Sequence, residues 1–334
     1  MRARARDAEA IERLRTIDTL IVDKTGTLTQ GRPAFRDVIA LGSVSPDEVL
    51  RLAASLDQGS EHPLAEAIVG EARRRGLALS PAQEFESATG IGVRGRVDGH
   101  TLALGNTALM REVGADLASS SELAERLRRE GASAMLLAVD QNVVAVIAVA
   151  DPVKDSTPAA IAALKAAELR LVMATGDGRT TAEAVARQLG IDEVHGEVRP
   201  ADKTALVARL KAEGRRVAMA GDGINDAPAL AAADVGVAMG TGTDVAMSTA
   251  QVTLVKGDLR GIVRAREISQ ATVRNMKQNL GFAFLYNALG VPIAAGVLYP
   301  AFGLLLSPMI AALAMSLSSV SVVANALRLR GARI

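Results

Sequence analysis

Directly after the short apolar run of residues 19–22, the sequence reads Asp23-Lys24-Thr25-Gly26-Thr27-Leu28-Thr29. The apolar and β-branched side chains of residues 19–22 predict a buried strand, and the small polar residues after them predict a loop at its end. A carboxylate in that position can attack a phosphoryl group and form an acyl phosphate. The small residues behind it let backbone amides approach the phosphate oxygens. The pattern therefore predicts a phosphoryl-transfer site with Asp23 as the nucleophile.

The sequence after Asp151 places this loop in an α/β fold. Apolar β-rich runs alternate there with helical patterns, which predicts parallel βαβ units. The predicted strands cover residues 170–174, 216–220, 235–238 and 252–254, and the predicted helices cover residues 159–167, 180–189 and 201–213. Ligands bind at the carboxyl ends of the strands in such doubly wound sheets, so Asp23, Thr175 and Asp222 are expected at one edge.

An inserted segment interrupts the alternation. Its helical patterns lie at residues 46–56, 64–75 and 121–129, and its strand-like runs at 92–97, 134–139 and 143–149. This mixture predicts a separate α+β domain at residues 33–150. The doubly wound domain would then consist of residues 19–32 and 151–257.

A second motif, Gly221-Asp222-Gly223-Ile224-Asn225-Asp226-Ala227-Pro228, follows the strand predicted at 216–220. A magnesium ion prefers oxygen ligands and phosphate groups, so its carboxylates point to a Mg²⁺ site. Gly-Asp-Gly alone is a common turn. The whole octapeptide, paired with residues 23–29, is far more specific.

Together the two motifs resemble those of the P-type ATPases, a group within the haloacid dehalogenase-like superfamily. The resemblance implies that Asp23 is phosphorylated, with Lys24 beside it. It also implies that Asp222 binds Mg²⁺ together with Asp23 and the carbonyl of Thr25. Asn225 and Asp226 would hold the phosphate and the geometry around the ion.

The residue two positions after the nucleophile separates pumps from phosphatases in this superfamily. Phosphatases usually carry an Asp there as general acid and base, whereas this chain has Thr25. Without that carboxylate, attack of water on the phosphoenzyme should be slow. A pump needs such a long-lived phosphoenzyme.

Two shorter pieces complete the resemblance. Thr175-Gly176-Asp177 can hold phosphate through the threonine hydroxyl and the following amide. Lys203, in Pro200-Ala201-Asp202-Lys203, can neutralise phosphoryl charge. Each piece is weak alone, because a lone helical lysine is usually a solvated surface charge. Their order along the chain matches the superfamily.

The insert carries Ser60-Glu61-His62-Pro63-Leu64. A lone His-Pro is also typical of a helix start, but heavy-metal ATPases place this motif in their nucleotide domain, where His62 would contact the adenine region. Gly90-Ile91-Gly92 and Gly105-Asn106 match further nucleotide contacts, and their glycines would let the backbone approach ATP. Many copper members have a Glu five residues before the His. Here Asp57 stands in that place, with a reach one methylene shorter.

The end of the chain looks like a membrane hairpin. Residues 279–326 contain no Lys, Arg, Asp or Glu, and two apolar spans lie at 278–298 and 304–327. Each is long enough to cross a bilayer as a helix. Basic residues flank both outer ends: Arg274, Lys277, Arg328, Arg330 and Arg333. By the positive-inside rule this predicts a multi-pass protein of the cell membrane, in contact with lipid, whose catalytic domains and chain ends are cytoplasmic. A pair of buried core helices is the alternative.

The flanking segments complete this domain plan. Residues 1–18 are expected to form a cytoplasmic stalk and residues 258–277 a stalk helix. Residues 278–327 would form the hairpin, and residues 328–334 a cytoplasmic tail.

Polar residues inside a membrane span are costly and usually functional. The first span contains Tyr286-Asn287, and the second contains Met315, Ser318 and Ser319. The thioether of Met315 is a soft ligand suited to Cu(I). The resemblance is to copper-transporting ATPases, which place Tyr-Asn in one helix and Met-x-x-Ser-Ser in the next, so these five residues are expected to bind the transported Cu(I) or Ag(I). Packing of helices through small residues is the alternative for the serines.

Composition sets further limits. The formal net charge is +1 and aromatic residues make up 2%, which argues against a nucleic-acid partner. The chain of 334 residues has no cysteine, so the family's Cys-Pro-Cys membrane ligands are absent, as is a Thr-Gly-Glu actuator motif. We therefore expect the catalytic half of a pump, whose partner would be an N-terminal half. The chain would be a fragment, one half of a split pump or a truncated product.

The resemblance as a whole predicts an enzyme, a P-type ATPase that uses MgATP to export Cu(I) or Ag(I). A membrane-anchored phosphatase of the same superfamily is one alternative, and Thr25 and the Ser-Glu-His-Pro-Leu motif argue against it. A non-catalytic ATP-binding remnant is another. The sequence leaves copper versus silver open.

Overall fold

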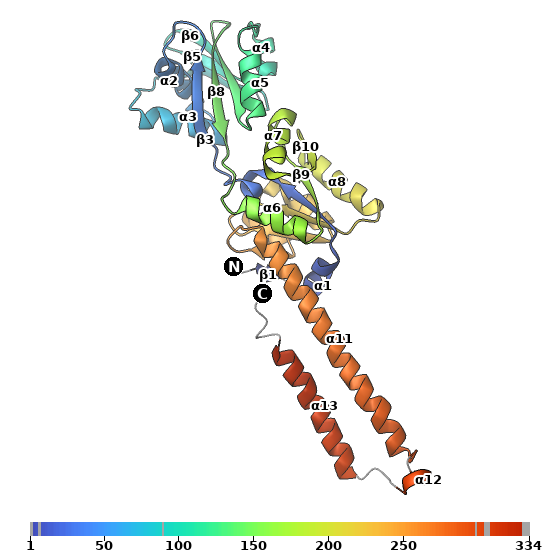
Figure 1. The fold of residues 1–334 in the computed structure, drawn as a ribbon. Coiled ribbons are helices and arrows are strands. Elements are labelled where there is room, and N and C mark those ends of the chain that lie inside the picture. The colour runs from blue at the N-terminus through green and yellow to red at the C-terminus, as the bar shows by residue number, and fades with distance from the viewer. Residues whose placement is uncertain (1–2, 6–7, 89, 298, 304–307, 329–334) are drawn as a thin grey trace. The chain divides into compact units, whose positions relative to one another are not determined.

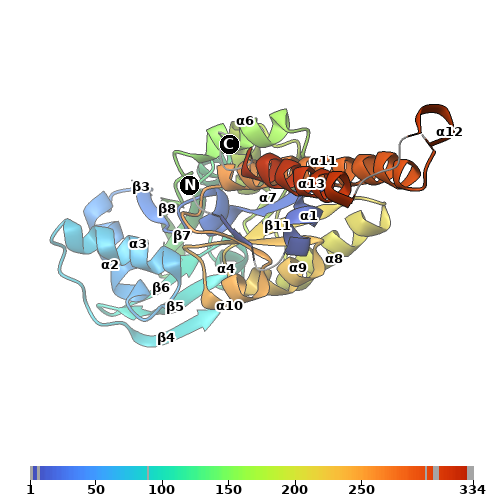
Figure 2. The ribbon, with the colours of Figure 1, turned by 90° about the horizontal axis from the view of Figure 1, so that it is seen from below.

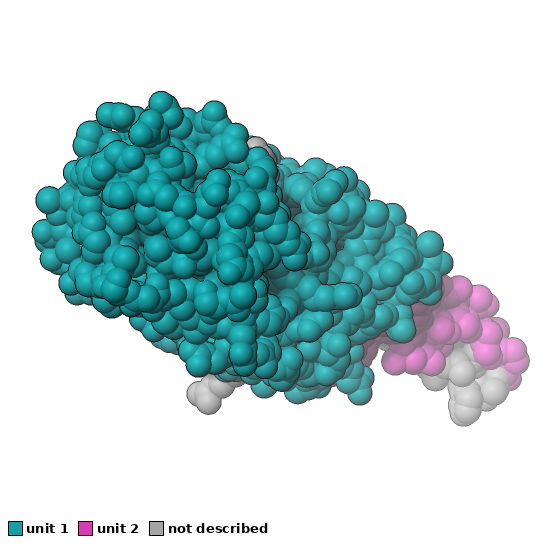
Figure 3. Space-filling view, turned by 90° about the horizontal axis from the view of Figure 1, so that it is seen from above, with its two compact units in different colours: residues 1–4, 17–260 teal, residues 5–16, 261–334 magenta. Residues whose placement is uncertain are grey.

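The computed structural model describes residues 3–5, 8–88, 90–297, 299–303 and 308–328. The chain divides into two compact units, which Figure 3 shows in different colours. The first comprises residues 1–4 and 17–260, and the second comprises residues 5–16 and 261–334.

A seven-stranded sheet forms the base of the first unit (Figure 1). Its strands lie in the order β1 (Ala3–Ala5), β13 (Val252–Leu254), β12 (Val235–Met239), β11 (Val217–Gly221), β2 (Thr19–Asp23), β9 (Arg170–Ala174) and β10 (Glu193–His195). The pairs from β13 to β10 are all parallel. All five residues of β2 are buried, as expected for a central strand of a parallel sheet. We call residues 17–32 and 151–260 the parallel module.

Helices cover both faces of this sheet (Figure 2). One face carries α6 (Thr157–Ala166) and α7 (Arg179–Leu189), and the other carries α8 (Pro200–Ala212), α9 (Ala227–Ala232) and α10 (Asp244–Thr249). Side chains of α8, α9 and α10 pack with those of β2, β9 and β11 in one hydrophobic cluster. This is the predicted doubly wound α/β architecture, so the carboxyl ends of β2 and β11 meet at one edge.

A six-stranded antiparallel sheet forms the rest of the first unit. Its order is β3 (Ala34–Ala40), β8 (Asn142–Ala150), β7 (Ser133–Val139), β6 (His100–Gly105), β5 (Gly92–Val97) and β4 (Gln83–Ala88). One face packs on α2 (Pro46–Asp57) and α3 (Pro63–Arg74), and the other on α4 (Thr107–Glu112) and α5 (Ser121–Arg129). We call residues 33–150 the antiparallel module.

Strand β8 shows how the antiparallel module is organised. Its residues Ala145, Ile147 and Val149 belong to the cluster under α2 and α3, while Val146 and Ala148 belong to the cluster under α4 and α5. This alternation follows from the two-residue period of a strand. A strand that is buried on both faces reads as a continuous apolar run, which is why residues 143–149 were recognisable in the sequence.

Three strands of this sheet were not predicted. Strand β4 lies at an edge and most of its residues are exposed, so its sequence shows no apolar pattern. Strand β3 lies at the other edge, and Val38 is the one buried residue among its seven. Strand β6 begins with two exposed residues before four buried ones, so the alternation that marks a strand is missing.

The second unit contains α1 (Ala8–Thr16), the long helix α11 (Arg260–Ala294), the short α12 (Tyr299–Phe302) and α13 (Pro308–Arg328). Side-chain amides join α11 to α13: Asn275 donates to the carbonyl of Asn325 at 2.7 Å, and Asn325 donates to Asn279 Oδ1 at 2.8 Å. In the part of the chain that the structure describes, no helix has the length and apolar character needed to cross a membrane. The spans at 278–298 and 304–327 stay predictions, and residues 298 and 304–307 lie outside the described ones.

Candidate active site

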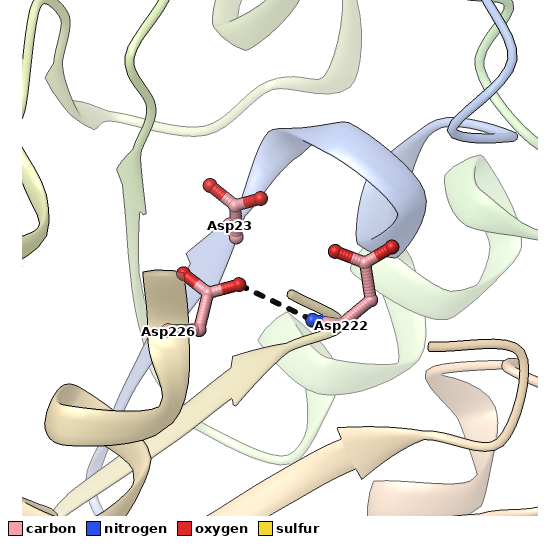
Figure 4. Close-up of side chains that lie close together, drawn as sticks. All are labelled: Asp23, Asp222 and Asp226. Carbon is pink, nitrogen blue, oxygen red and sulfur yellow. Dashed lines mark hydrogen bonds between the residues drawn. The ribbon is translucent and has the colours of Figure 1, made fainter. Parts of the chain in front are cut away.

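Three carboxylates meet at the edge where β2 and β11 end (Figure 4). Asp23 is the last residue of β2, Asp222 follows β11, and Asp226 belongs to the 3₁₀ turn Ile224–Asp226. One oxygen of each lies within 4.8 Å of the others. Asp226 is fixed by the backbone amides of Asp222 and Gly223, which donate to its Oδ2 at 3.3 and 3.2 Å. Two loops that are far apart in sequence therefore build one acidic cluster.

Lys203 lies between two of these carboxylates. Its ammonium donates to Asp23 Oδ1 at 2.6 Å and to Asp226 Oδ1 at 2.7 Å. All three side chains are buried. Helix α8 supplies the lysine from its first turn, where Pro200 is suited to start a helix. The sequence could not place this lysine in the site without the resemblance, but the structure does.

The electrostatics favour a further positive charge at this site. Burial raises the pKa of Asp23 to about 7, against the opposing effect of Lys203. Burial, followed by the charge of Asp226, raises the pKa of Asp222 to about 6. Although burial opposes it, the charges of Asp23 and Asp226 raise the pKa of Lys203 above its usual value. The cluster therefore holds more negative charge than Lys203 can neutralise.

Gly26 determines how closely the first loop approaches Asp222. Its φ angle is +68°, in the left-handed region that favours glycine. A Cβ atom built on Gly26 would lie 1.6 Å from Asp222 Oδ2. Any other residue would displace that carboxylate, which gives a physical reason for glycine at the fourth position of the motif.

The remaining residues of the predicted site surround the cluster. Lys24 forms an ion pair with Asp177. Thr175, after β9, accepts a hydrogen bond from the amide of Asp177 through its hydroxyl at 3.2 Å. Gly176 lies between them on the same loop. Thr25 and Asn225 are exposed, Thr25 on the loop after β2 and Asn225 in the 3₁₀ turn.

The donor set fits a magnesium ion. Hard divalent cations take carboxylate oxygens and phosphate, and Asp23 and Asp222 offer such oxygens close in sequence to the exposed residues Thr25 and Asn225. Burial raises the pKa of both residues, and the charge of Asp226 adds to this effect at both, so a bound cation would favour their ionised forms.

A second site lies in the antiparallel module. A cavity of about 1020 Å³ is lined by all seven residues that the sequence assigned to a nucleotide: Asp57, Glu61, His62, Gly90, Gly92, Gly105 and Asn106. The cavity continues to Gly178, Arg179, Thr180, Thr181 and Glu197 of the parallel module. The structure thus brings these predicted residues together, in a cavity large enough for a nucleotide.

Asp57 is the unusual member of this cavity. It ends α2 and is 3% exposed, and its Oδ2 has no hydrogen-bond partner among the described residues. Burial raises its pKa to about 7. A buried polar atom without a partner is costly, so this carboxyl is suited to a ligand that donates a hydrogen bond.

The other cavity residues also have structural roles. His62 caps α3, with Nδ1 accepting a hydrogen bond from the amide of Leu64 at 3.2 Å. Asn106 caps α4 and donates to the carbonyl of Gly90 at 3.0 Å. A Cβ on Gly92 would lie 2.3 Å from the carbonyl of Leu104. Gly92 is thus needed for close strand packing, whether or not a ligand is bound.

Two residues that the sequence analysis did not single out support the phosphorylation loop. Asp151 accepts hydrogen bonds from the hydroxyl of Thr29 and from the amides of Gly31 and Arg32. It joins the two segments that connect the modules. Lys154 donates to the carbonyls of Gly26 and Gly257. The only signal for either was the Asp151-Pro152 step at the end of the insert.

The residues predicted to bind transported metal lie on α11 and α13. The hydroxyls of Tyr286 and Ser321 are 3.5 Å apart, which places these parts of the helices side by side. The hydroxyl of Ser319 donates a hydrogen bond to the carbonyl of Met315 in the same helix at 3.1 Å. Ser318 is half-buried. Asn287 and Met315 are exposed. Metal binding by these five residues stays a prediction.

Comparison with known proteins agrees with this fold and site. Residues 17–234 match a family described as haloacid dehalogenase-like hydrolase, and the chain belongs to that family. It is 60% identical to a copper-transporting P-type ATPase of Rhizobium leguminosarum bv. viciae, over 98% of this chain and 39% of the relative. It is 53% identical to a silver exporting P-type ATPase of Salmonella typhimurium, again over 98% of this chain and 39% of the relative. The resemblance to heavy-metal P-type ATPases is confirmed.

A solved structure gives the same result. The chain matches a zinc-transporting PIB-type ATPase with a TM-score of 0.78 and 34% identity, over 98% of this chain and 52% of that chain. This likeness confirms the predicted haloacid dehalogenase-like fold class. The chain spans about two fifths of the length of the two relatives above.

Proposed function

We propose that this chain is the catalytic part of an ATP-driven pump that exports Cu(I) or Ag(I), and that Asp23 carries the phosphoryl group. The observation that carries the proposal is the arrangement of Asp23, Lys203 and Asp226, with Lys203 bonded to both carboxylates. A nucleophile at a strand end and a lysine that can neutralise phosphoryl charge are the parts that this chemistry needs. The sequence likeness to copper and silver pumps supports the choice of metal.

The first step is transfer of the terminal phosphoryl group to Asp23. A carboxylate oxygen of Asp23 forms a bond to the terminal phosphorus, the bond from that phosphorus to the bridging oxygen breaks, and ADP leaves with the electron pair. Asp23 must be ionised to attack. Lys203 holds one of its oxygens and neutralises part of the charge on the phosphoryl oxygens.

Asp23 and Asp222 would hold Mg²⁺, which supplies charge neutralisation for the phosphoryl oxygens when bound. Thr25 would contribute its carbonyl oxygen. Asp226 keeps Lys203 in place, and its bonds to the amides of Asp222 and Gly223 fix the loop that carries Asp222.

The phosphoenzyme should be long-lived in this chain. Thr25 replaces the acid and base that a phosphatase would use, so no side chain at that position can activate water. We therefore propose slow hydrolysis of the phosphoenzyme by this chain alone. In the pumps of this family, a Glu of the actuator domain positions that water.

The cavity of the antiparallel module is proposed to bind ATP. Its unpartnered carboxyl at Asp57 can accept a hydrogen bond from the amino group of adenine. His62 and the two segments that contain Gly90, Gly92, Gly105 and Asn106 would surround the base and ribose.

Metal transport is proposed for this chain together with the additional segments of its longer relatives. The ligands of the transported metal would be Tyr286, Asn287, Met315, Ser318 and Ser319.

The decisive experiment is acid-stable labelling with ATP that carries ³²P on its terminal phosphate, in the presence of Mg²⁺. Wild type is compared with Asp23→Asn, Asp23→Ala and a matched control, Asp192→Asn, whose carboxylate is exposed and lies outside both sites. Hydroxylamine-sensitive label that is lost in both Asp23 variants and kept in the control is the expected result. A folded, ATP-binding wild type that takes no label would overturn the proposal.

A further inference from the structure

A contact between the two modules joins α5 to α7 (Figure 1). The hydroxyl of Thr180, in the first turn of α7, donates to Glu125 Oε1 on α5 at 2.8 Å. The hydroxyl of the next residue, Thr181, donates to the carbonyl of Ala132 at 3.2 Å. Two consecutive threonines of the parallel module thus hold two points of the antiparallel module.

Burial and charge show that this contact is specific. Thr181 and Ala132 are buried, so an unmade hydrogen bond there would be costly. The hydrogen bond from Thr180, followed by that from Arg128, lowers the pKa of Glu125, so the acceptor is ionised at neutral pH. Hydrogen bonds to an ionised acceptor are stronger than those between neutral groups.

The first turn of α7 is close to both proposed sites in sequence and in space. It begins two residues after Asp177, whose carboxylate pairs with Lys24 beside the nucleophile. Residues 178–181 also line the cavity that contains Asp57 and His62. A change in how α5 sits on α7 would therefore change how the cavity faces the catalytic loop.

We propose that Thr180 and Thr181 are positioning residues, which dock the antiparallel module through Glu125 and Ala132 so that a nucleotide in the cavity presents its terminal phosphate to Asp23. This inference rests on the proposed phosphorylation of Asp23 by ATP. It assigns to α7 a role separate from that of the Thr175-Gly176-Asp177 loop before it. The threonines do not touch the reacting atoms.

The test uses the full chain and separates docking from chemistry. Labelling of Asp23 is measured against ATP concentration for wild type, Thr180→Val, Thr180→Ser and Glu125→Ala. Loss of one such hydrogen bond shifts the equilibrium between docked and undocked modules roughly tenfold. Thr180→Val and Glu125→Ala are therefore expected to need more ATP for half-maximal labelling, by up to roughly tenfold, whereas Thr180→Ser, which keeps the hydroxyl, should behave like wild type. Thr249→Val is the control, because that hydroxyl bonds the carbonyl of Val245 within α10.

Labelling from ³²P-acetyl phosphate distinguishes the docking role from damage to the site. This small donor reaches Asp23 without the nucleotide cavity, so Thr180→Val should lose less labelling with it than with ATP. A Thr180→Val chain that needs no more ATP than wild type, or that Thr180→Ser fails to rescue, would overturn the proposal. A wild type that takes label from neither donor would instead overturn the proposed function. Cross-linking then tests whether α5 and α7 are in contact.

The absence of cysteine makes cross-linking direct. The pair Glu125→Cys with Thr180→Cys is treated with a short thiol-to-thiol reagent. The matched pair is Glu125→Cys with Arg187→Cys, two turns further along α7. Cross-linking of the first pair alone supports the docked arrangement. Equal cross-linking of both pairs, or none of either, contradicts it.

Discussion

Asp57 offers a sharp test of how burial and ligand binding are balanced in the cavity. The change Asp57→Asn keeps the size and polarity of the side chain and removes its charge. Burial raises the pKa of Asp57 from 3.8 to about 7. Because the folded pKa is raised, the folded protein binds this proton more tightly than the unfolded chain does. Stability from this group is therefore lost as pH rises above about 4.

The magnitude follows from the two pKa values. With 3.8 unfolded and about 7 folded, the free energy of unfolding falls by roughly 2.5 kcal/mol from about pH 5 to about pH 8. Asp57→Asn has no such loss. Relative to wild type it should therefore gain roughly 2.5 kcal/mol over that range, seen as a rising difference in melting temperature.

The same charge should control nucleotide binding. The ionised carboxylate is a stronger hydrogen-bond acceptor for the adenine amino group than the protonated acid is, and at about pH 6 roughly one-tenth of Asp57 is ionised. The dissociation constant of a non-hydrolysable ATP analogue should then be roughly tenfold higher at about pH 6 than at about pH 8 in wild type. In Asp57→Asn it should be nearly independent of pH, because the amide oxygen accepts a hydrogen bond at either pH.

Calorimetric titration of the analogue at three pH values measures this directly. Asp192→Asn, with its exposed carboxylate, is the control. His62 also lines the cavity, and it is unchanged in the variant. Equal pH dependence in wild type and Asp57→Asn would show that a group other than Asp57 causes the effect, and no pH dependence in wild type would refute the argument from burial.

Three further changes test the active site and its support. Lys203→Met removes the only side-chain cation bonded to Asp23 among the described residues. The pH at which labelling is half-maximal should therefore rise, and the free energy of unfolding should fall by about 3–5 kcal/mol. A pH profile of labelling identical to that of wild type would contradict this. Gly26→Ala places a Cβ against Asp222, so labelling of the variant should fall steeply and need more Mg²⁺. If the variant is labelled at low Mg²⁺ as strongly as wild type, the loop can move aside. Asp151→Ala loses three hydrogen bonds of about 1 kcal/mol each, so the free energy of unfolding should fall by about 3 kcal/mol in thermal unfolding. An unchanged melting temperature would mean that water replaces these hydrogen bonds.

Most strands of the parallel module could be predicted from the sequence, because central strands that are buried on both faces are rich in apolar residues. Residues 20–22 and 171–174 are unbroken apolar stretches, and they lie within β2 and β9. Edge strands give no such signal: β4 is largely exposed, and its pairing partner β5 supplies the pattern that it lacks.

The site divides in the same way. Asp23 and Asp222 could be found because each lies in a local motif. Asp226 lies in the same motif as Asp222, whereas Lys203 is linked to Asp23 only by the fold, and the resemblance alone placed it there. The Thr180 contact with Glu125 had no sequence signal, because it joins residues that are 55 positions apart and common on helix surfaces.

The position of the insert also affects the order in which the chain can fold during synthesis. All strands of the antiparallel module lie within residues 33–150, so that module can form as soon as it leaves the ribosome. Strand β2 is made earlier, but its neighbours β9 and β11 are Arg170–Ala174 and Val217–Gly221. This strand, with Leu20, Ile21 and Val22 at its centre, must therefore wait, unpaired, for a long stretch of chain to emerge. The residue that the proposed chemistry depends on, Asp23, thus ends an apolar segment of the nascent chain that stays unpaired until late and is exposed to aggregation meanwhile.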